Sequence, residues 1–404
     1  MAGKCRLRGE RFQPMLWDMN QQADAEYEWL ATGGAMLSRM LAAIAEARQS
    51  IRLEMYIVHT GAMAEQFREA LIQARRRGAR VQVLVDALGS MVLPESFWSH
   101  LRDAGGEFRW FNPLSLTFFS IRDHRKLLVC DERLAFVGGV NIASEYEGDG
   151  VATGWRDLGL AVRGPLACEL SAAFDEMFAH ADFRHPPFSR LRKSPRQKTV
   201  AAPAAQLLLG GPSRNNPIKL ALRHDLRTAR SVRIICAYFL PTWRIRLELA
   251  HAAGRGARVQ LILPGKSDLP FSRLAGQSFY RRLLLAGVEI YEYQPQILHA
   301  KMFLIDDVVY AGSANLDPRA LSINYELMVR LSHPGLAQRG AEIFEGDLAH
   351  CQRIDLESWR KARTLIDRFK ARLAFLILAR LDPMVAGWQW RWTGAEARGD
   401  TPGS

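Results

Sequence analysis

The chain repeats itself, and this duplication constrains its fold more than any other feature. RRRGARVQVLVD (75–86) returns as AGRGARVQLILP (253–264), and HRKLLVCDERLAFVGGVN (124–141) returns as HAKMFLIDDVVYAGSAN (299–315). Two further pairs, QSIRLEMYIV with RSVRIICAYFL and AGGEFRWF with AGVEIYEY, keep the same order at nearly the same offset. Four blocks in one order indicate an internal repeat, so each copy is expected to form one structural unit.

Within each copy, apolar strands alternate with helices. A helix at 36–45 or 219–229 comes first, and later helices end at glycines, where a left-handed C-cap is favourable. The expected strands are 51–58, 81–85 and 134–137 in the first copy, and 232–239, 259–263 and 308–311 in the second. Strands alternating with helices predict an α/β fold with a largely buried sheet. Two copies predict two duplicated α/β domains with a pseudo-two-fold relation.

The boundaries of the two units follow from composition. A stretch at 185–203, HPPFSRLRKSPRQKTVAAP, is rich in proline and basic residues and has no apolar periodicity, which is typical of a linker. We therefore predict a first domain at 1–190, a linker at 191–205, a second domain at 206–350 and a basic tail at 351–404.

The charge balance favours a polyanionic partner. The chain has 404 residues, with 54 Lys and Arg against 42 Asp and Glu, a net charge of +12. Nucleic acid and an anionic lipid surface both fit this excess. Five widely spaced cysteines without a CxxC pair argue against a disulfide framework or a zinc site. We expect no signal peptide and no spanning helix, because no apolar stretch reaches about 18 residues.

A histidine and a lysine two residues apart recur in both copies, as His124 with Lys126 and His299 with Lys301. On a strand, residues i and i+2 point to the same side. Placing these polar side chains in an apolar strand sacrifices burial, which indicates a functional site. Lysine supplies a point charge for a phosphate, and histidine serves as nucleophile or proton carrier near neutral pH.

The complete motif resembles the HKD signature of the phospholipase D superfamily, HxKxxxxD followed by a glycine turn and an asparagine. Asp131 and Asn141 complete it in the first copy, and Asp306, Ser313 and Asn315 in the second. The segments GSANLDPRALSINYE (312–326) and WRDLGLAVRGP (155–165) resemble bacterial cardiolipin synthases, in particular those without N-terminal transmembrane helices. The resemblance covers almost the whole chain and implies two α/β sandwich domains with a single shared active site.

The resemblance also implies a mechanism in two steps. One histidine attacks phosphorus to form a phosphohistidine, and the other protonates the leaving alkoxide and then activates the acceptor alcohol. We assign the nucleophile to His124 and the acid–base role to His299. The lysines, with Asn141, Asn315 and Ser313, are expected to bind the phosphate oxygens. Because the lysines supply the positive charge, neither a metal nor another cofactor is implied.

Four carboxylates complete the expected site. Asp157 follows His124 in the first copy and Glu326 follows His299 in the second, each in an apolar stretch, and we expect both to orient histidines. Asp131 and Asp306 are counted with the catalytic motif, although a position directly after a strand also suits support of the backbone. Gly139 stands where the second copy has Ser313, which predicts one hydroxyl fewer at the phosphate in the first half.

Two segments favour lipid over nucleic acid. From 359 to 380 a basic helix carries Ile366, Phe369, Leu373, Leu376 and Ile377 at helical spacing, followed by Trp388, Trp390 and Trp392. Such a helix is typical of an interfacial anchor, and packing on the body of the protein is the alternative. The apolar segment 111–120, FNPLSLTFFS, is expected at the rim of the site, with 269–284 as a second wall or as core.

Three functions remain open at this point. The first is a phosphatidyl transferase that makes cardiolipin and glycerol from phosphatidylglycerol, a peripheral enzyme at the cytoplasmic face of the bacterial membrane. The second is a phosphodiesterase that uses water, either a phospholipase or a nuclease. The third, a non-catalytic lipid binder, is disfavoured because both motifs are complete. We expect anionic phospholipids such as phosphatidylglycerol and cardiolipin as partners, and no nucleic acid.

Overall fold

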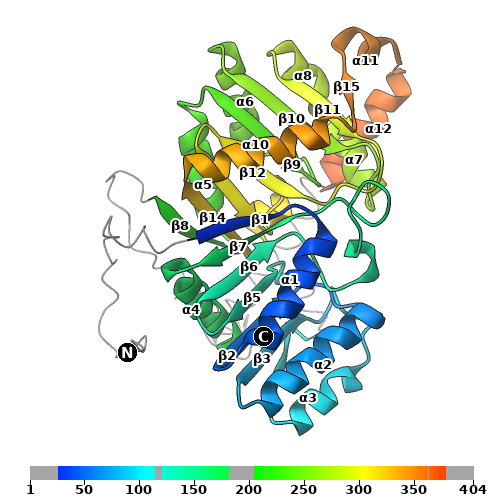
Figure 1. Ribbon diagram of the computed structural model, residues 1–404. Helices are drawn as coiled ribbons and strands as arrows, with labels where there is room; N and C mark the ends of the chain where they lie inside the picture. Colours follow the sequence, from blue (N-terminus) through cyan, green and yellow to red (C-terminus); the bar gives the residue numbers. More distant parts are fainter. Residues whose placement is uncertain (1–25, 114–120, 182–203, 214, 363, 379–404) are drawn as a thin grey trace, which may run out of the picture.

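A computed structural model describes residues 26–113, 121–181, 204–213, 215–362 and 364–378. It contains two α/β units that lie one above the other in Figure 1, the first coloured blue to green and the second green to orange. The predicted duplication is confirmed, because each unit is built on one mixed sheet with helices on it.

The first sheet has seven strands in the order β1-β7-β6-β5-β2-β3-β4. Its strands are β1 (Glu26–Leu30), β2 (Ser50–Met55), β3 (Arg80–Asp86), β4 (Glu107–Phe111), β5 (Leu127–Cys130), β6 (Leu134–Gly138) and β7 (Gly159–Arg163). The helices of this half are α1 (Gly33–Glu46), α2 (Ala62–Arg76), η2 (Glu95–Trp98), α3 (Ser99–Asp103), η3 (Ser144–Tyr146) and α4 (Pro165–Ala179).

The second sheet has eight strands in the order β15-β11-β10-β9-β12-β13-β14-β8. Its strands are β8 (Ala205–Gly210), β9 (Ser231–Cys236), β10 (Arg258–Pro264), β11 (Glu289–Tyr293), β12 (Lys301–Ile305), β13 (Val308–Gly312), β14 (Glu326–Ser332) and β15 (Cys351–Ile354). Its helices are α5 (Pro217–Leu226), α6 (Trp243–Gly254), α7 (Pro270–Gly276), η5 (Gln277–Phe279), α8 (Tyr280–Leu285), α9 (Pro318–Ser322), α10 (Pro334–Leu348), α11 (Leu356–Ala362) and α12 (Leu365–Leu376).

The two sheets have the same strand order. Read from β8, the second sheet runs β14, β13, β12, β9, β10 and β11, which matches β1, β7, β6, β5, β2, β3 and β4 of the first. In both, a parallel group of three strands follows an antiparallel group of four. The extra strand β15 pairs antiparallel with β11 and has no counterpart in the described part of the first half.

A common apolar core joins the halves. One cluster of buried side chains takes Leu127 and Val129 from β5, Phe174 from α4, Val309 from β13 and Phe344 from α10. The faces away from this core are covered separately, by α1, α2 and α3 in the first half and by α5, α6 and α8 in the second. The halves therefore bury one continuous apolar layer, and the motif strands β5 and β12 line it.

Local sequence signals set several element ends. The side chain of Thr32 caps the start of α1 and that of Asn216 caps α5, each accepting a hydrogen bond from a first-turn amide. After α2 and α6, Gly78 and Gly256 adopt φ of 98° and 91°, which a residue with a β-carbon rarely adopts. The glycine stops predicted from the sequence are thus at equivalent positions.

Two strands of the second sheet lie at the predicted domain boundaries, which themselves stay a prediction. The second sheet begins at Ala205, inside the expected linker, and continues through β15, so the expected tail from 351 starts with a strand of that sheet. Antiparallel pairing of β15 with β11 adds this strand to the edge of the sheet. The linker residues 185–203 and the tryptophans at 388–392 lie outside the described residues.

Candidate active site

The two motif histidines precede their strands instead of lying within them. β5 begins at Leu127 and β12 at Lys301, so His124 and His299 lie on the extended entry to each strand. Each is tied to the opposite half: His124 N donates to Tyr325 O at 2.9 Å, and His299 N donates to Arg156 O at 2.8 Å. These short cross-links bring both histidines to the junction of the halves.

Each histidine is held by a carboxylate from the other half. Nδ1 of His124 lies 3.0 and 3.1 Å from the two oxygens of Glu326, and Nδ1 of His299 lies 2.6 Å from Oδ2 of Asp157. Sequence reasoning identified both acids but associated each with the histidine of its own copy. The correction follows from the docking of the halves, because β7 and β14 place the acids opposite the partner motif.

Both motif lysines are buried beside their histidines. Lys126 Nζ donates to His124 O at 2.7 Å, and Lys301 Nζ lies 3.2 Å from Nε2 of His299. Burial lowers the pKa of both ammonium groups, and that of Lys126 falls to about 7. An anion bound beside the two lysines would raise their pKa values and restore the protonated form. The pair therefore favours binding of an anion.

The electrostatics of the site keep the imidazoles neutral. Burial and the charge of Lys126 lower the pKa of His124 well below its ordinary value, with further contributions from Lys301 and His299. Burial and Lys301 also lower the pKa of His299, although the Asp157 carboxylate opposes this shift. The influence of Lys301 and His299 on His124 indicates that both motifs belong to one site.

At the Gly139–Ser313 position, the two halves accommodate their carboxylates in different ways. Ser313 Oγ donates to Glu326 Oε2 at 2.5 Å and accepts from Leu327 N at 3.0 Å. A β-carbon on Gly139 would lie 2.4 Å from Asp157 Oδ1. The Ser313 hydroxyl therefore positions the acid of its own half, and the expected phosphate-binding role of Ser313 stays a prediction. Gly139 leaves space for the equivalent acid.

The two asparagines hold backbone at corresponding places. Asn141 Oδ1 accepts from Ile57 N at 3.1 Å, and Asn315 Oδ1 accepts from Tyr238 N at 3.4 Å. The amide of Asn141 also donates to the Tyr146 hydroxyl at 2.8 Å. An amide NH2 has two N–H groups, so the contact with Tyr146 leaves the phosphate-binding assignment of Asn141 as a prediction.

The motif aspartates lie away from the histidines. Asp131 accepts from the amides of residues 48, 49 and 50 at 3.0, 2.7 and 2.9 Å, and Asp306 accepts from those of residues 230 and 231 at 3.0 and 2.8 Å. Five residues of extended chain separate Asp131 from Lys126, about 16 Å. The two aspartates therefore fix the starts of β2 and β9, and counting them with the catalytic residues stays a prediction.

Several aromatic residues were not predicted. The Tyr56 ring lies edge-on to His124 at 4.8 Å, and His299 is surrounded by Tyr146, Trp155 and Tyr238 at 5.5, 5.7 and 6.1 Å between ring centroids. Tyr56 directly follows β2, at the carboxyl edge of a parallel pair, where ligand sites of α/β sheets gather. That position was an available sequence signal, whereas the place of Trp155 depends on the docking of the halves.

The structure describes the second expected wall, 269–284, fully and the first, 111–120, only in part. Phe111 is buried and contacts the Tyr325 ring at 5.7 Å, so it belongs to the core and not to a rim. Residues 114–120 of that segment lie outside the described residues. In the second wall, Phe279 and Tyr280 are buried, whereas Leu269 and Phe271 are exposed.

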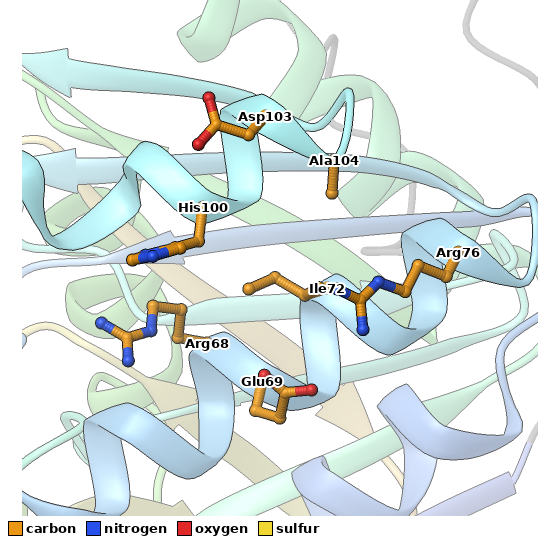
Figure 2. A pocket seen from close by; sticks show the side chains of 7 residues that line it. All are labelled: Arg68, Glu69, Ile72, Arg76, His100, Asp103 and Ala104. Carbon is orange, nitrogen blue, oxygen red and sulfur yellow. The ribbon is translucent and has the colours of Figure 1, made fainter.

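A separate surface feature contains none of the motif residues. It is a hollow of about 560 Å³ between α2 and α3 (Figure 2), lined by Arg68, Glu69, Ile72, Arg76, His100, Asp103 and Ala104. Among the residues that the structure describes, no group of three or more His, Cys, Asp or Glu side chains could hold a metal ion, and no helix is long and apolar enough to span a membrane.

Comparison with known families decides the assignment. The family described as "Cardiolipin synthase, PLD-like domain" matches residues 40–179 and 222–348, so each matched segment contains one motif. The chain belongs to this family. It is therefore an enzyme of the phospholipase D superfamily, a transferase of phospholipid metabolism.

Individual relatives agree with the family over most of their length. The cardiolipin synthase of Geobacillus kaustophilus is 32% identical over 372 residues, 88% of this chain and 72% of the relative. Cardiolipin synthase B of Salmonella typhi is 31% identical over 376 residues, 90% of each chain. The crystal structure of phosphatidylserine synthase from Haemophilus influenzae superposes with a TM-score of 0.71, covering 91% of this chain and 95% of that one. At 15% identity, that likeness shows the fold alone.

Proposed function

We propose that this enzyme is a cardiolipin synthase. It moves a phosphatidyl group from one phospholipid to the glycerol headgroup of phosphatidylglycerol, and glycerol leaves when the donor is also phosphatidylglycerol. The observation that carries the proposal is the crossed pairing of each histidine with a carboxylate of the opposite half. With Nδ1 held in this way, each imidazole is left with Nε2 for chemistry.

In the first step, Nε2 of His124 attacks phosphorus. A P–N bond forms and the P–O bond to the donor headgroup breaks, while His299 gives its proton to the leaving alkoxide. The lowered pKa of His124 supports its assignment as the neutral nucleophile. The negative charge of the bound phosphodiester raises the pKa of His299, which burial lowers in the empty site, so that this ring enters the step protonated.

In the second step, the acceptor replaces the histidine. His299, now neutral, takes the proton from a glycerol hydroxyl of phosphatidylglycerol, and the resulting oxygen attacks phosphorus as the P–N bond breaks. Lys126 and Lys301, with Asn141 and Asn315, stabilise the charge on the non-bridging oxygens in both steps. Water in place of the alcohol would give hydrolysis, so exclusion of water separates a transferase from a phospholipase.

The proposal extends to the partners of the enzyme. Its substrates are anionic phospholipids, and the excess of 54 basic over 42 acidic residues suits a membrane with anionic lipid. We place the enzyme at the cytoplasmic face of a bacterial membrane as a peripheral protein. No nucleic acid substrate is expected.

One product analysis tests the reaction. The purified enzyme is incubated with vesicles of labelled phosphatidylglycerol, with and without EDTA, and cardiolipin, phosphatidic acid and glycerol are resolved. Cardiolipin with glycerol is expected in both conditions, because lysines supply the charge that a metal would otherwise provide. Phosphatidic acid alone would identify a hydrolase, and cleavage of added plasmid DNA would identify a nuclease.

Histidine variants test the division of roles. His124→Ala and His299→Ala are each expected to reduce turnover by at least about 10³-fold, and the exposed His100→Ala serves as control. After long incubation and quenching at alkaline pH, mass spectrometry should find phosphatidyl adducts on His124 in the His299→Ala variant, because the adduct forms slowly without its acid and then lacks the base that activates the acceptor. An adduct on His299 instead would reverse the assignment, and substantial turnover in either alanine variant would contradict the two-histidine mechanism.

A further inference from the structure

Helix α12 packs one side on the protein, including Phe375 against the Phe279 ring, and exposes a row of large apolar side chains on the other side. Ala371 and Ala374 are buried, and Ala374 contacts Ala275 of α7, beside which α12 lies in Figure 1. The opposite side of the helix exposes a stripe of Ile366, Phe369, Leu373, Leu376 and Ile377, with 65% of Ile366 and 67% of Phe369 accessible. The packed side of α12 already has Phe375 against the Phe279 ring at 4.9 Å between centroids, so the exposed stripe is a second apolar side that is available to another surface.

α7, the helix on which α12 packs, lies next to the active site. α7 follows β10 after a short segment in which Asp268 accepts a hydrogen bond of 2.5 Å from the Tyr238 hydroxyl, and the Tyr238 ring lies 6.1 Å from that of His299. Leu269 and Phe271, at the start of α7, are exposed as well. We call Leu269, Phe271 and the α12 stripe together the second rim. It borders the site on the side of His299.

An equivalent segment borders the site on the side of His124. It follows β3, the counterpart of β10, and exposes Met91 and Val92, with 64% of Met91 accessible. Its Ser90 Oγ donates to Tyr56 O at 3.1 Å, and Tyr56 contacts His124. We call Met91 and Val92 the first rim. Because the two rims occupy corresponding places in the repeat, they flank the histidine pair from opposite sides.

We propose that the two rims insert together into a phospholipid bilayer, so that the site faces the headgroups. This inference rests on the proposed function, whose substrates lie in that bilayer. Positive charge supports a membrane with anionic lipid as the partner, because Lys370 and Arg372 of α12 are exposed beside the stripe. Apolar side chains interspersed with cations are typical of surfaces that bind anionic membranes. The phosphodiester then reaches both histidines without leaving the membrane.

Glutamine variants test this face while keeping its charge. Phe369→Gln removes the second rim's most exposed residue, Met91→Gln alters the first rim, and both are combined in a double variant. The control is Leu285→Gln, which changes a leucine with 57% of its surface exposed at the end of α8, near the sheet edge where β11 starts and opposite the site. Flotation with vesicles of phosphatidylcholine and phosphatidylglycerol measures partitioning, and thermal unfolding checks that each full-length variant is folded.

The expected result is a several-fold loss of partitioning in each single variant and roughly a tenfold or greater loss in the double, because separate sites add. The control should match the unaltered enzyme. Turnover of phosphatidylglycerol in vesicles should fall in parallel, whereas turnover of dihexanoyl-phosphatidylglycerol below its micelle concentration should not.

Three outcomes would overturn the inference. Unchanged partitioning of the double variant would show that the rims do not contact lipid. A dimer by light scattering that Phe369→Gln dissociates, without change in partitioning, would assign the stripe to a second copy of the chain. If the partitioning of the double variant is unchanged, and partitioning rises only when residues 379–404 are removed, the stripe would be assigned to a contact with that segment. Absence of turnover by the unaltered enzyme on either lipid would instead contradict the proposed function, whatever the flotation result.

Discussion

At the scale of single residues, the site depends on space reserved for two carboxylates. Asp157 and Glu326 occupy equivalent positions, before β7 and at the start of β14, but they differ by one methylene. The shorter acid stands over Gly139, and the longer one accepts a hydrogen bond from Ser313. Among the signature residues, the one that differs between the copies, Gly139 or Ser313, thus compensates for the difference in length between the two acids.

Replacing Gly139 by serine and Ser313 by glycine should have unequal effects on kcat. Gly139→Ser places a side chain where Asp157 lies, so His299 loses its orienting acid and kcat should fall about 10²–10⁴-fold. Ser313→Gly removes one hydrogen bond to Glu326 and should cost about tenfold or less. Steady-state kinetics of both variants on phosphatidylglycerol provide the comparison. Equal losses would contradict the distinct roles given to these positions.

Activity should also decline at alkaline pH. Burial lowers the pKa of Lys126 to about 7, so this residue loses its charge in the empty site as pH rises through that value. Binding of the anionic phosphodiester requires the charged form, and kcat/KM reports the free enzyme. We expect kcat/KM on a short-chain phosphatidylglycerol to fall above about pH 7, while the lowered pKa of His124 keeps the acidic limb below 6.5. A constant kcat/KM between neutral and strongly alkaline pH would exclude this role for Lys126.

At the scale of elements, each motif spans a strand and performs a different task at each end. The histidine and lysine lie at the entry of β5 or β12, and the aspartate just beyond its exit binds the amides that start the neighbouring strand. Asp131 and Asp306 adopt left-handed φ of 53° and 50°, which aspartate tolerates better than most residues. The aspartate of the HKD motif therefore fixes the alignment of β2 with β5, and of β9 with β12.

Removing the charge of these aspartates should affect stability more than chemistry. Asp131→Asn and Asp306→Asn weaken hydrogen bonds from two or three backbone amides and should each lower the free energy of unfolding by about 1–3 kcal/mol. The neighbouring exposed Asp307→Asn is the control. Denaturant unfolding and kcat at low temperature are measured side by side. A large loss of kcat with unchanged unfolding would support a catalytic role.

At the scale of the whole molecule, buried contacts between the halves maintain the site. Arg156, whose carbonyl accepts from His299 N, forms a bidentate pair with Asp347 of α10 at 2.7 and 2.8 Å. Both side chains are buried, and Arg156 also donates to Asp157 O at 3.0 Å. This ion pair joins α10 to the segment that carries the orienting acid of His299.

Breaking this pair should cost more than replacing it. Asp347→Asn leaves the Arg156 guanidinium buried without a counter-charge and should lower the free energy of unfolding by about 3–5 kcal/mol. The double variant Arg156→Met with Asp347→Leu should recover most of that loss. Glu357→Gln, in an exposed pair with Lys361, is the control and should change stability by about 1 kcal/mol or less. Similar losses in the control and in Asp347→Asn would contradict a structural role for the buried pair.

The features that repeat along the sequence could be predicted, whereas the contacts that depend on how the two halves dock could not. The duplicated HxK spacing and the glycine stops were enough to place two α/β units and both histidines. The crossed acids could not be predicted, because Asp157 and Glu326 are each close in sequence to one histidine and close in space to the other. The task of Ser313 was missed for a related reason, since its acid approaches only across the β13–β14 pairing.

The crossed carboxylates couple assembly to chemistry. A half made separately would carry an imidazole without its acid and an acid without its imidazole, so neither half could retain partial activity. If the halves are produced as separate polypeptides, turnover should rise with the square of their concentration, until association is complete. Fusion of the two copies in one chain replaces that dependence on concentration with a fixed, intramolecular encounter.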